Sequence, residues 1–137
     1  MQVGRLLAGS SPALWGIRID KEDSPSRPFR AEVQELAIAC ARLLGLPEHP
    51  NPGDVDLLED WLEPGYGVVS AAEQEAVSLA ARMEGLLLDP VYTGRAFAGL
   101  VDLVRKGAFS PRDRVLFWHT GGLPSLFPYR NELLSQG

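Results

Sequence analysis

Two tyrosines of this sequence stand in short segments rich in turn-forming residues. Tyr66 lies in the segment EPGYG and Tyr92 in the segment LDPVYTG, so both phenols are expected beside loops. A phenol has an unperturbed pKa of about 10, so acid or base catalysis would need a neighbour that lowers this pKa, such as a second phenol. The structural alternative is a half-buried ring whose hydroxyl bonds to the backbone. The residues alone favour this structural alternative for both tyrosines.

A second candidate site is the loop Thr120-Gly121-Gly122, which follows the apolar segment RVLFWH. In open α/β sheets, ligands bind beyond the carboxyl ends of the strands, which is where this loop is expected. Two glycines allow the backbone to approach a flat ligand closely, and the threonine hydroxyl can donate to or accept from a ring nitrogen. A tight glycine turn without a ligand is the alternative.

The other reactive side chains give no pattern of a metal or redox site. His119 precedes Thr120, and strand alternation would turn it to the opposite face, so a supporting or core role is expected. His49 lies far from it in a proline-rich loop, so no metal-ligand spacing exists and no metal is predicted. The single cysteine, Cys40, excludes an internal disulfide and is expected to be a buried helix residue. Asp89 precedes a proline and is expected to form a turn.

Composition excludes several classes of protein. The chain has 137 residues, is 45% hydrophobic and carries a net charge of -5, which suits one modest domain spanning residues 1–137. Its basic residues are scattered, so no nucleic-acid partner is expected. Apolar runs fall far short of the roughly 20 residues that a membrane helix needs. No secretory signal is visible, and a cytoplasmic location is expected.

The first half of the sequence alternates helical and strand patterns. Residues 1–9 show helical spacing without an N-cap before them, which suggests that the chain begins inside an element. Residues 13–19 predict a buried strand, and residues 29–45 an amphipathic helix that ends at a glycine. Loops are expected at 20–28 and 46–53, a weaker strand at 54–58 and a turn at 63–67.

The second half repeats this alternation. Ser70 and Glu73 form a capping-box pattern for a helix that ends near Gly85. Thr93 is a plausible cap for another helix, which runs to Gly107. Residues 114–119 predict a strand, and 123–134 a short helix or turn. The sequence therefore predicts an α/β fold, a partial open parallel sheet with helices on both faces.

The ordered segments EPGYG, EGLLLDPVYTG and VLFWHTGG resemble the C-terminal end of one enzyme family. It is the D-cysteine desulfhydrase and 1-aminocyclopropane-1-carboxylate deaminase family, whose members use pyridoxal phosphate and have the tryptophan synthase beta-like fold (fold type II). The resemblance implies that Tyr66 and Tyr92 lie at the substrate side of the cofactor and act in catalysis. It implies cofactor contacts for Thr93 and Thr120, the latter facing the pyridine nitrogen, and for Gly121 and Gly122.

Two positions suggest a branch of this family. The deaminases typically have glutamate after the second tyrosine and leucine before the Gly-Gly pair, whereas this chain has Thr93 and Thr120. Threonines provide neutral hydrogen bonds, and a glutamate would keep the ring nitrogen protonated. The pattern resembles the desulfhydrase branch, which converts D-cysteine to pyruvate, ammonia and sulfide. Arg95 replaces the lysine usual in the family segment YTGKA, which changes the geometry of the charge.

Family members are more than twice as long as this chain, and the lysine to which the cofactor bonds lies in the part it lacks. Lys21 and Lys106 are its two lysines, and both have the pattern of surface residues. The chain is therefore expected to be inactive alone and competent only with an N-terminal partner chain. The alternative is a non-catalytic remnant that binds another protein or a second copy of itself, and weak binding of pyridoxal phosphate without turnover is a third possibility.

Overall fold

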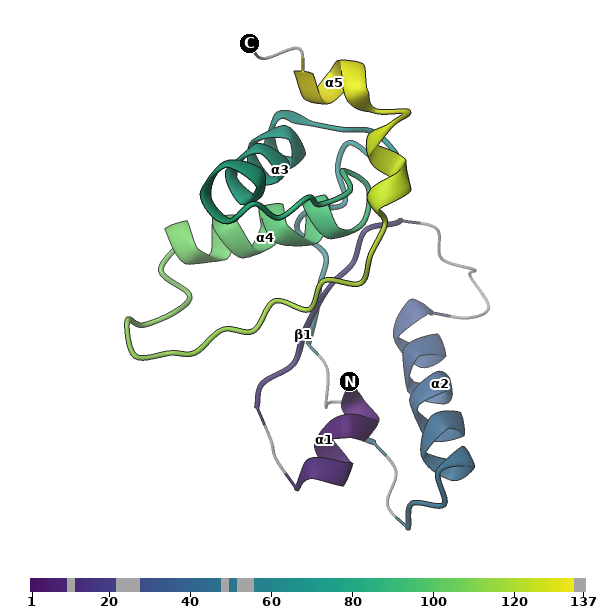
Figure 1. Cartoon of the computed structure of the whole chain (residues 1–137). Helices are drawn as coiled ribbons and strands as arrows, with labels where there is room; N and C mark the ends of the chain where they lie inside the picture. Colours follow the sequence, from purple (N-terminus) through teal and green to yellow (C-terminus); the bar gives the residue numbers. More distant parts are fainter. Residues whose placement is uncertain (10–11, 22–27, 48–49, 52–55, 135–137) are drawn as a thin grey trace. The chain divides into compact units, whose positions relative to one another are not determined.

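The computed structural model describes residues 1–9, 12–21, 28–47, 50–51 and 56–134 (Figure 1). It contains two compact units, one formed by Met1–Gly16 with Glu22–Leu58 and the other by Ile17–Lys21 with Glu59–Gly137. Whether residues 1–137 form a single cooperative domain stays a prediction.

The first unit combines two helices with a small parallel sheet. Its elements are α1 (Gln2–Ala8), β1 (Trp15–Ile17, which ends at the unit boundary), α2 (Phe29–Leu43) and β2 (Asp56–Leu58). The two strands are neighbours in a two-stranded sheet, and the backbone N–H of Asp56 donates to the Leu14 carbonyl at 3.0 Å. Helix α2 packs on α1 and buries Ala37 and Ala41. The α/β alternation predicted for this half of the chain is confirmed.

Two details of the first unit differ from the prediction. The strand expected over residues 13–19 is shortened to β1 and is only half-buried, because one neighbouring strand covers one edge. Cys40 is exposed, since the buried stripe of α2 runs through Ala37 and Ala41. The loops predicted at 20–28 and 46–53, the first residues of the predicted strand 54–58 and His49 lie wholly or partly outside the described residues.

Helix α3 (Ala71–Glu84) opens the helical part of the second unit and has the predicted ends. The Ser70 hydroxyl accepts from the Ala72 N–H at 3.2 Å, and the Glu73 carboxylate accepts from the Ser70 N–H at 2.8 Å. This reciprocal capping box satisfies N–H groups that the first turn leaves unpaired. Gly85 ends the helix at φ +67°, a left-handed conformation that favours glycine.

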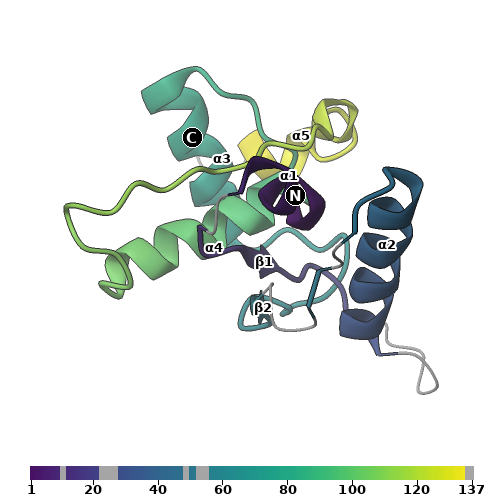
Figure 2. The same cartoon turned by 90° about the horizontal axis from the view of Figure 1, so that it is seen from below.

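Helix α4 (Thr93–Arg105) packs against α3, and the two lie side by side in both views of the molecule (Figure 1, Figure 2). Gly94 permits this close approach, because a Cβ there would lie 2.5 Å from the Asp89 carbonyl oxygen and 2.9 Å from a methyl of Val77. A small core fills the space beside the helices. Its buried members are Val77, Ala80 and Leu88, and Phe97, Phe117, Leu126 and Leu133 pack against them.

The strand predicted over residues 114–119 is absent, and this prediction is wrong for the chain as it stands. The segment runs from the end of α4 without pairing to another strand within the described part of the chain (Figure 1). Phe117 packs edge-on against Phe97 of α4, with ring centroids 5.2 Å apart. Beyond it, a 3-10 helix η1 (Leu123–Leu126) and α5 (Arg130–Leu134) form the predicted short terminal helices.

Candidate active site

Tyr66 and Tyr92 meet at the N-terminal end of α4. Their hydroxyls hydrogen bond to each other, and their rings are arranged edge to face with centroids 6.0 Å apart and planes inclined by 67°. Tyr66 comes from the loop after Trp61 and Tyr92 from the turn before α4, 26 residues later. The fold thus brings together the two tyrosines that the sequence singled out, and both remain partly exposed.

The contact with Tyr92 raises the pKa of Tyr66 above its usual value of 10, and partial desolvation and the nearby Asp20 and Tyr129 act in the same direction. From the sequence, acid or base work by Tyr66 was expected to need a neighbour that lowers this pKa. The opposite holds here because the hydrogen bond favours the neutral form of Tyr66. At neutral pH Tyr66 is therefore a proton donor and not a phenolate base.

Asp89 organises the turn that carries Tyr92. Its carboxylate is fully buried and accepts hydrogen bonds from the N–H groups of Val91, Tyr92 and Thr93 at 2.7–2.9 Å. The Thr93 hydroxyl donates to the same carboxylate at 2.7 Å and lies 3.1 Å from the Asp89 N–H, from which it accepts. The predicted cap, Thr93, is instead the first residue of α4, the N-cap position is Tyr92 without a side-chain cap, and Asp89 accepts from the Thr93 N–H out of the preceding turn. The predicted role of Asp89 as a turn former is confirmed.

This geometry places Thr93 inside the protein. Only 2% of its surface is exposed, and both hydrogen bonds of its hydroxyl go to Asp89. A cofactor contact by Thr93 stays a prediction, in which its backbone or the turn that it stabilises would face the ligand.

The glycine loop lies against the same turn. A Cβ on Gly122 would be 2.5 Å from a carboxylate oxygen of Asp89, so the Gly122 backbone contacts that side chain directly. Gly121 and Gly122 adopt φ values of +108° and +99°, which side-chain-bearing residues rarely adopt. Thr120 is exposed, and so is His119, contrary to the core role considered for it. The Asp89 carboxylate therefore contacts both Gly122 and the turn that carries Tyr92.

Two residues that the sequence did not assign to the site hold the Tyr66 loop in place. The Tyr129 hydroxyl donates to the Gly67 carbonyl at 2.7 Å. Arg95 on α4 is 1% exposed and donates to the carbonyls of Gly65 and Val68 at 2.8 and 2.7 Å. The sequence signals for these contacts are weak, because an arginine or tyrosine pattern does not reveal which distant carbonyl it reaches.

The described residues fit one side of pyridoxal phosphate and not the whole cofactor. The exposed Thr120 and the open Gly121 backbone could face the pyridine ring. The amine of Lys21, however, is paired with Glu63, and that of Lys106 lies 2.7 Å from Asp102. Both lysines are about half exposed or more, as expected for surface residues. The chain therefore offers no amine that is buried and free to bond the cofactor.

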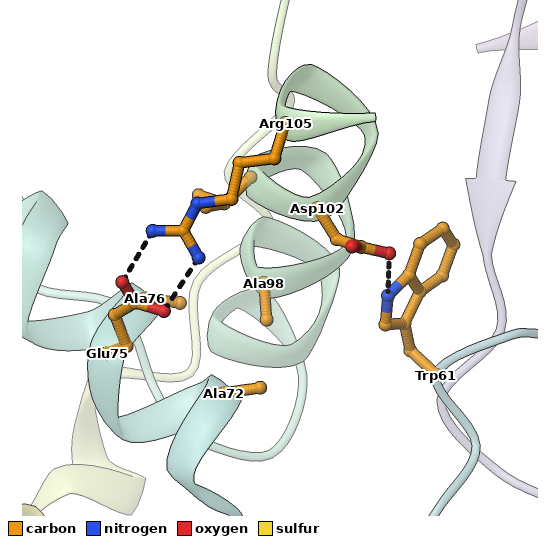
Figure 3. A pocket seen from close by; sticks show the side chains of 8 residues that line it. Trp61, Ala72, Glu75, Ala76, Ala98, Asp102 and Arg105 are labelled. Atoms are coloured by element: carbon orange, nitrogen blue, oxygen red, sulfur yellow. Dashed lines mark hydrogen bonds and ion pairs between the residues drawn. The ribbon is translucent and has the colours of Figure 1, made fainter. Parts of the chain in front are cut away.

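A hollow of about 290 Å³ lies elsewhere, between α3, α4 and Trp61 (Figure 3). Figure 3 shows the Arg105 guanidinium bonded through two nitrogens to Glu75, at 2.9 and 2.5 Å, and the Trp61 indole N–H bonded to Asp102 at 3.0 Å. Its charged side chains thus already have partners, Arg105 and Glu75 each other and Asp102 the Trp61 indole and Lys106, and no predicted site residue lines it.

Within the described residues, no three His, Cys, Asp or Glu side chains are grouped so that they could hold a metal ion. In the same part of the chain, no helix is both long and apolar enough to cross a membrane.

Comparisons with known proteins agree with the resemblance of the motifs. The chain is 44% identical over 113 residues to a 1-aminocyclopropane-1-carboxylate deaminase of Methylobacterium sp. (strain 4-46), which covers 82% of this chain and 33% of the relative. It is 42% identical over 116 residues to a D-cysteine desulfhydrase of Salmonella typhi, covering 85% of the chain and 34% of the relative. These similar identities do not separate the two branches.

A crystal structure of an ACC deaminase homologue superposes with a TM-score of 0.79 at 32% identity, over 98% of this chain and 38% of the other. This likeness confirms the predicted α/β class and its relation to fold type II. The chain spans about a third of the length of the curated relatives that it matches. Residues 6–121 match the family model described as pyridoxal-phosphate dependent enzyme, and the chain therefore belongs to that family.

Proposed function

We propose that this chain forms the tyrosine-bearing, ring-facing part of a pyridoxal phosphate-dependent lyase similar to D-cysteine desulfhydrase. The observation that carries the proposal is the direct contact between Tyr66 and Tyr92, which come from separate segments. The Tyr92 N–H bonds to Asp89, whose carboxylate also lies against Gly122. Family membership and the identity to both named relatives support a reaction on an amino acid.

D-Cysteine is the proposed substrate because of Thr93 and Thr120. Neither position supplies a carboxylate, so a ring nitrogen beside Thr120 would receive a neutral hydrogen bond. Bound pyridoxal phosphate would supply the electron sink that permits loss of the α-proton and the β-thiol. Tyr66, whose raised pKa keeps it protonated at neutral pH, would donate a proton to the departing sulfur, and Tyr92 would orient that phenol.

The chain requires a second polypeptide segment under this proposal. Both of its lysines are ion-paired, and it spans a third of its relatives' length. An N-terminal partner chain would supply the lysine that bonds the cofactor, and the proposed location of the pair is the cytoplasm. A second copy of this chain would bring the same two surface lysines and no others.

The test is reconstitution. The chain would be co-expressed with the N-terminal two-thirds of the Salmonella typhi relative, loaded with pyridoxal phosphate and assayed for sulfide and pyruvate from D-cysteine. Tyr66→Phe and Tyr92→Phe are each expected to lower kcat about 100-fold or more, in the range of general acid-base effects. Ser110→Ala is the control, because it removes a hydroxyl that accepts from the Arg112 N–H in an exposed turn and belongs to no predicted site.

A reconstituted pair that binds the cofactor and releases no sulfide contradicts the proposal for D-cysteine. Release of ammonia from the cyclopropane amino acid in the same pair would assign the deaminase activity instead. A separate check uses the chain alone with pyridoxal phosphate, borohydride and mass spectrometry. A stoichiometric pyridoxyl adduct on Lys21 or Lys106 would overturn the statement that the chain lacks a cofactor lysine.

A non-catalytic interaction module is the second candidate. It is favoured by the unpaired segment over residues 114–119, in which Leu116 and Trp118 are exposed. Such a module would form a stable complex or homodimer without cofactor, and a strictly monomeric chain would exclude it.

A further inference from the structure

Arg95 makes an unusual set of contacts for a side chain with 1% exposure. Its Nε donates to a carboxylate oxygen of Glu73 at 2.7 Å. Its Nη1 donates to the carbonyls of Ile19 at 3.1 Å and Gly65 at 2.8 Å, and its Nη2 to the carbonyl of Val68 at 2.7 Å. Three of its four acceptors are therefore backbone carbonyls of loops and not side chains.

Two of these carbonyls belong to residues on either side of Tyr66 in the sequence. Gly65 precedes the tyrosine directly and Val68 follows it by two residues. The Arg95 guanidinium therefore hydrogen bonds to the loop before and after Tyr66. Arg95 itself lies three residues after Tyr92, in the first turn of α4. One side chain thus joins the helix that begins beside Tyr92 to the loop that presents Tyr66.

We propose that Arg95 is a positioning residue that holds the Tyr66 loop against α4 so that the phenols of Tyr66 and Tyr92 meet. The inference rests on the proposed function, in which this tyrosine pair forms the acid-base group. It extends that function by naming the residue that sets the geometry of the pair.

The shape of the guanidinium explains why arginine suits this position. Its planar fork directs donors in several fixed directions at once, whereas a lysine ammonium places all three donors on one atom. A lysine that kept the ion pair with Glu73 would have to release one or more of the carbonyls around Tyr66. Lysine is usual at this position in the resembled segment YTGKA, so Arg95→Lys restores the residue of that segment.

The first test compares Arg95→Lys with Arg105→Lys. Both variants keep a positive charge on α4, but Arg105 is exposed and its guanidinium bonds to the Glu75 side chain. With ¹³Cζ-labelled tyrosine, the Tyr66 pKa in Arg95→Lys is expected to fall toward about 10, the value of a free phenol. Nuclear Overhauser effects between the two rings should weaken in the same variant. Arg105→Lys should show neither change.

A merely structural role for Arg95 predicts a different outcome. Arg95→Lys would then lower the melting temperature while the Tyr66 pKa and the contacts between the rings stayed as in Arg105→Lys, and this result would overturn the proposal. Glu73→Gln separates the two parts of the interaction. It removes the charge of the ion pair and leaves the carbonyl acceptors, so the proposal expects lower stability with an unchanged Tyr66 pKa.

A measurement on the unmodified chain keeps the proposal testable if Arg95→Lys does not fold. Hydrogen-bond scalar couplings between the Arg95 Nη nitrogens and the carbonyl carbons of Gly65 and Val68 are expected, with slow rotation of the guanidinium. Freely rotating Nη groups without such couplings would refute the hydrogen bonds from Arg95 to the Tyr66 loop. No substrate or cofactor enters these tests, so their failure is distinct from a failure of lyase activity in the reconstituted pair.

Discussion

Tyr66 and Tyr92 keep 52% and 43% of their surface exposed although their hydroxyls bond to each other. This combination is what an acid-base pair needs, because a ligand can reach the phenols while one of them controls the proton of the other. Asp89, in contrast, has a structural role. It is fully buried, and its carboxylate is used entirely to shape the turn before α4.

The phenol contact gives a prediction on titration. In Tyr92→Phe the Tyr66 pKa should fall toward its usual value of about 10, because the hydrogen bond that favours the neutral phenol is lost. In the unmodified chain, the stabilisation linked to Tyr66 is complete below pH 10 and is lost as the pH rises through the raised folded-state pKa. Tyrosine ¹³Cζ shifts between pH 8 and 12 measure the effect, and identical Tyr66 curves in both proteins would refute it.

Removing the Asp89 carboxylate should destabilise the fold. Asp89→Ala leaves the N–H groups of Val91, Tyr92 and Thr93 without their acceptor in a buried turn, and we expect a loss of about 2–3 kcal/mol in the free energy of unfolding. Asp113→Ala is the control, because its carboxylate accepts from the Ser110 N–H in an exposed turn and should cost about 0.5 kcal/mol. Urea denaturation of both variants gives the comparison, and equal losses would contradict the role of Asp89 in this turn.

At the scale of elements, α4 is the part that assembles the site. Tyr92 immediately precedes it, Arg95 in its first turn reaches the Tyr66 loop, and Asp89 before it touches the backbone of Gly122. Helix α3 also contributes, since the carboxylate of Glu73, part of its capping box, accepts a hydrogen bond from the Arg95 side chain. A change at Arg95 that releases the Gly65 and Val68 carbonyls should therefore alter the contact between the two phenols.

The contact between the glycine loop and Asp89 predicts different costs for two neighbouring glycines. Gly122→Ala adds a Cβ 2.5 Å from the Asp89 carboxylate at φ +99°, and we expect a loss of about 2–3 kcal/mol. Gly121→Ala meets no atom within 4 Å and carries only the backbone strain of φ +108°, about 1 kcal/mol. Chemical denaturation separates the two, and an equal or larger loss in Gly121→Ala would show that the loop does not rest on Asp89.

The capping box of α3 predicts an acid-sensitive fold. Burial alone would raise the pKa of Glu73, but hydrogen bonds from Ser70 and Arg95 outweigh it and lower the pKa below 4.5. This stabilisation is present above pH 4.5 and is lost as the pH falls through the lowered folded-state pKa. Glu73→Gln should flatten the stability curve below pH 5.

The control for this acid sensitivity is Glu75→Gln on the same helix. The Glu75 pKa is also lowered, by the Arg105 guanidinium, but the pair is exposed and should contribute little. Thermal unfolding between pH 3 and 7 tests both variants. A Glu73→Gln protein with the acid slope of the unmodified chain would contradict the prediction.

For the whole molecule, the exposed apolar side chains of the second unit are the dominant feature. Leu116, Trp118, Phe127 and Leu134 are each more than half exposed, and the segment over residues 114–119 pairs with no strand in the described part of the chain. The chain also spans about a third of the length of its curated relatives. Unpaired extended backbone and apolar patches favour association with another chain.

We therefore expect the isolated chain to elute above its 14.9 kDa monomer mass in size-exclusion chromatography with light scattering at micromolar concentration. The double variant Leu116→Lys/Trp118→Lys should shift it toward the monomer. Leu36→Lys, at an exposed position of α2, is the control and should leave the mass unchanged. A monomer in all three proteins would refute self-association through this segment.

Local sequence was enough for the features that depend on neighbouring residues. Ser70 with Glu73 specified a capping box, Gly45 and Gly85 specified helix ends, and the α/β alternation followed from the periodicity of apolar residues. The choice of Tyr66 and Tyr92 as candidates came from the ordered family segments. Each of these predictions used residues within about ten positions of the helix end, turn or tyrosine that it concerned.

Only the tertiary structure decided the contacts between distant segments. It placed the two phenols together, set the direction of the Tyr66 pKa shift, made Thr93 the first residue of α4 and not its cap, and assigned the loop contacts of Arg95. It also left residues 114–119 without a strand partner among the described residues, because a strand forms only where a neighbouring strand accepts its hydrogen bonds. Such contacts depend on which groups folding brings within hydrogen-bonding distance, and local sequence patterns do not contain that information.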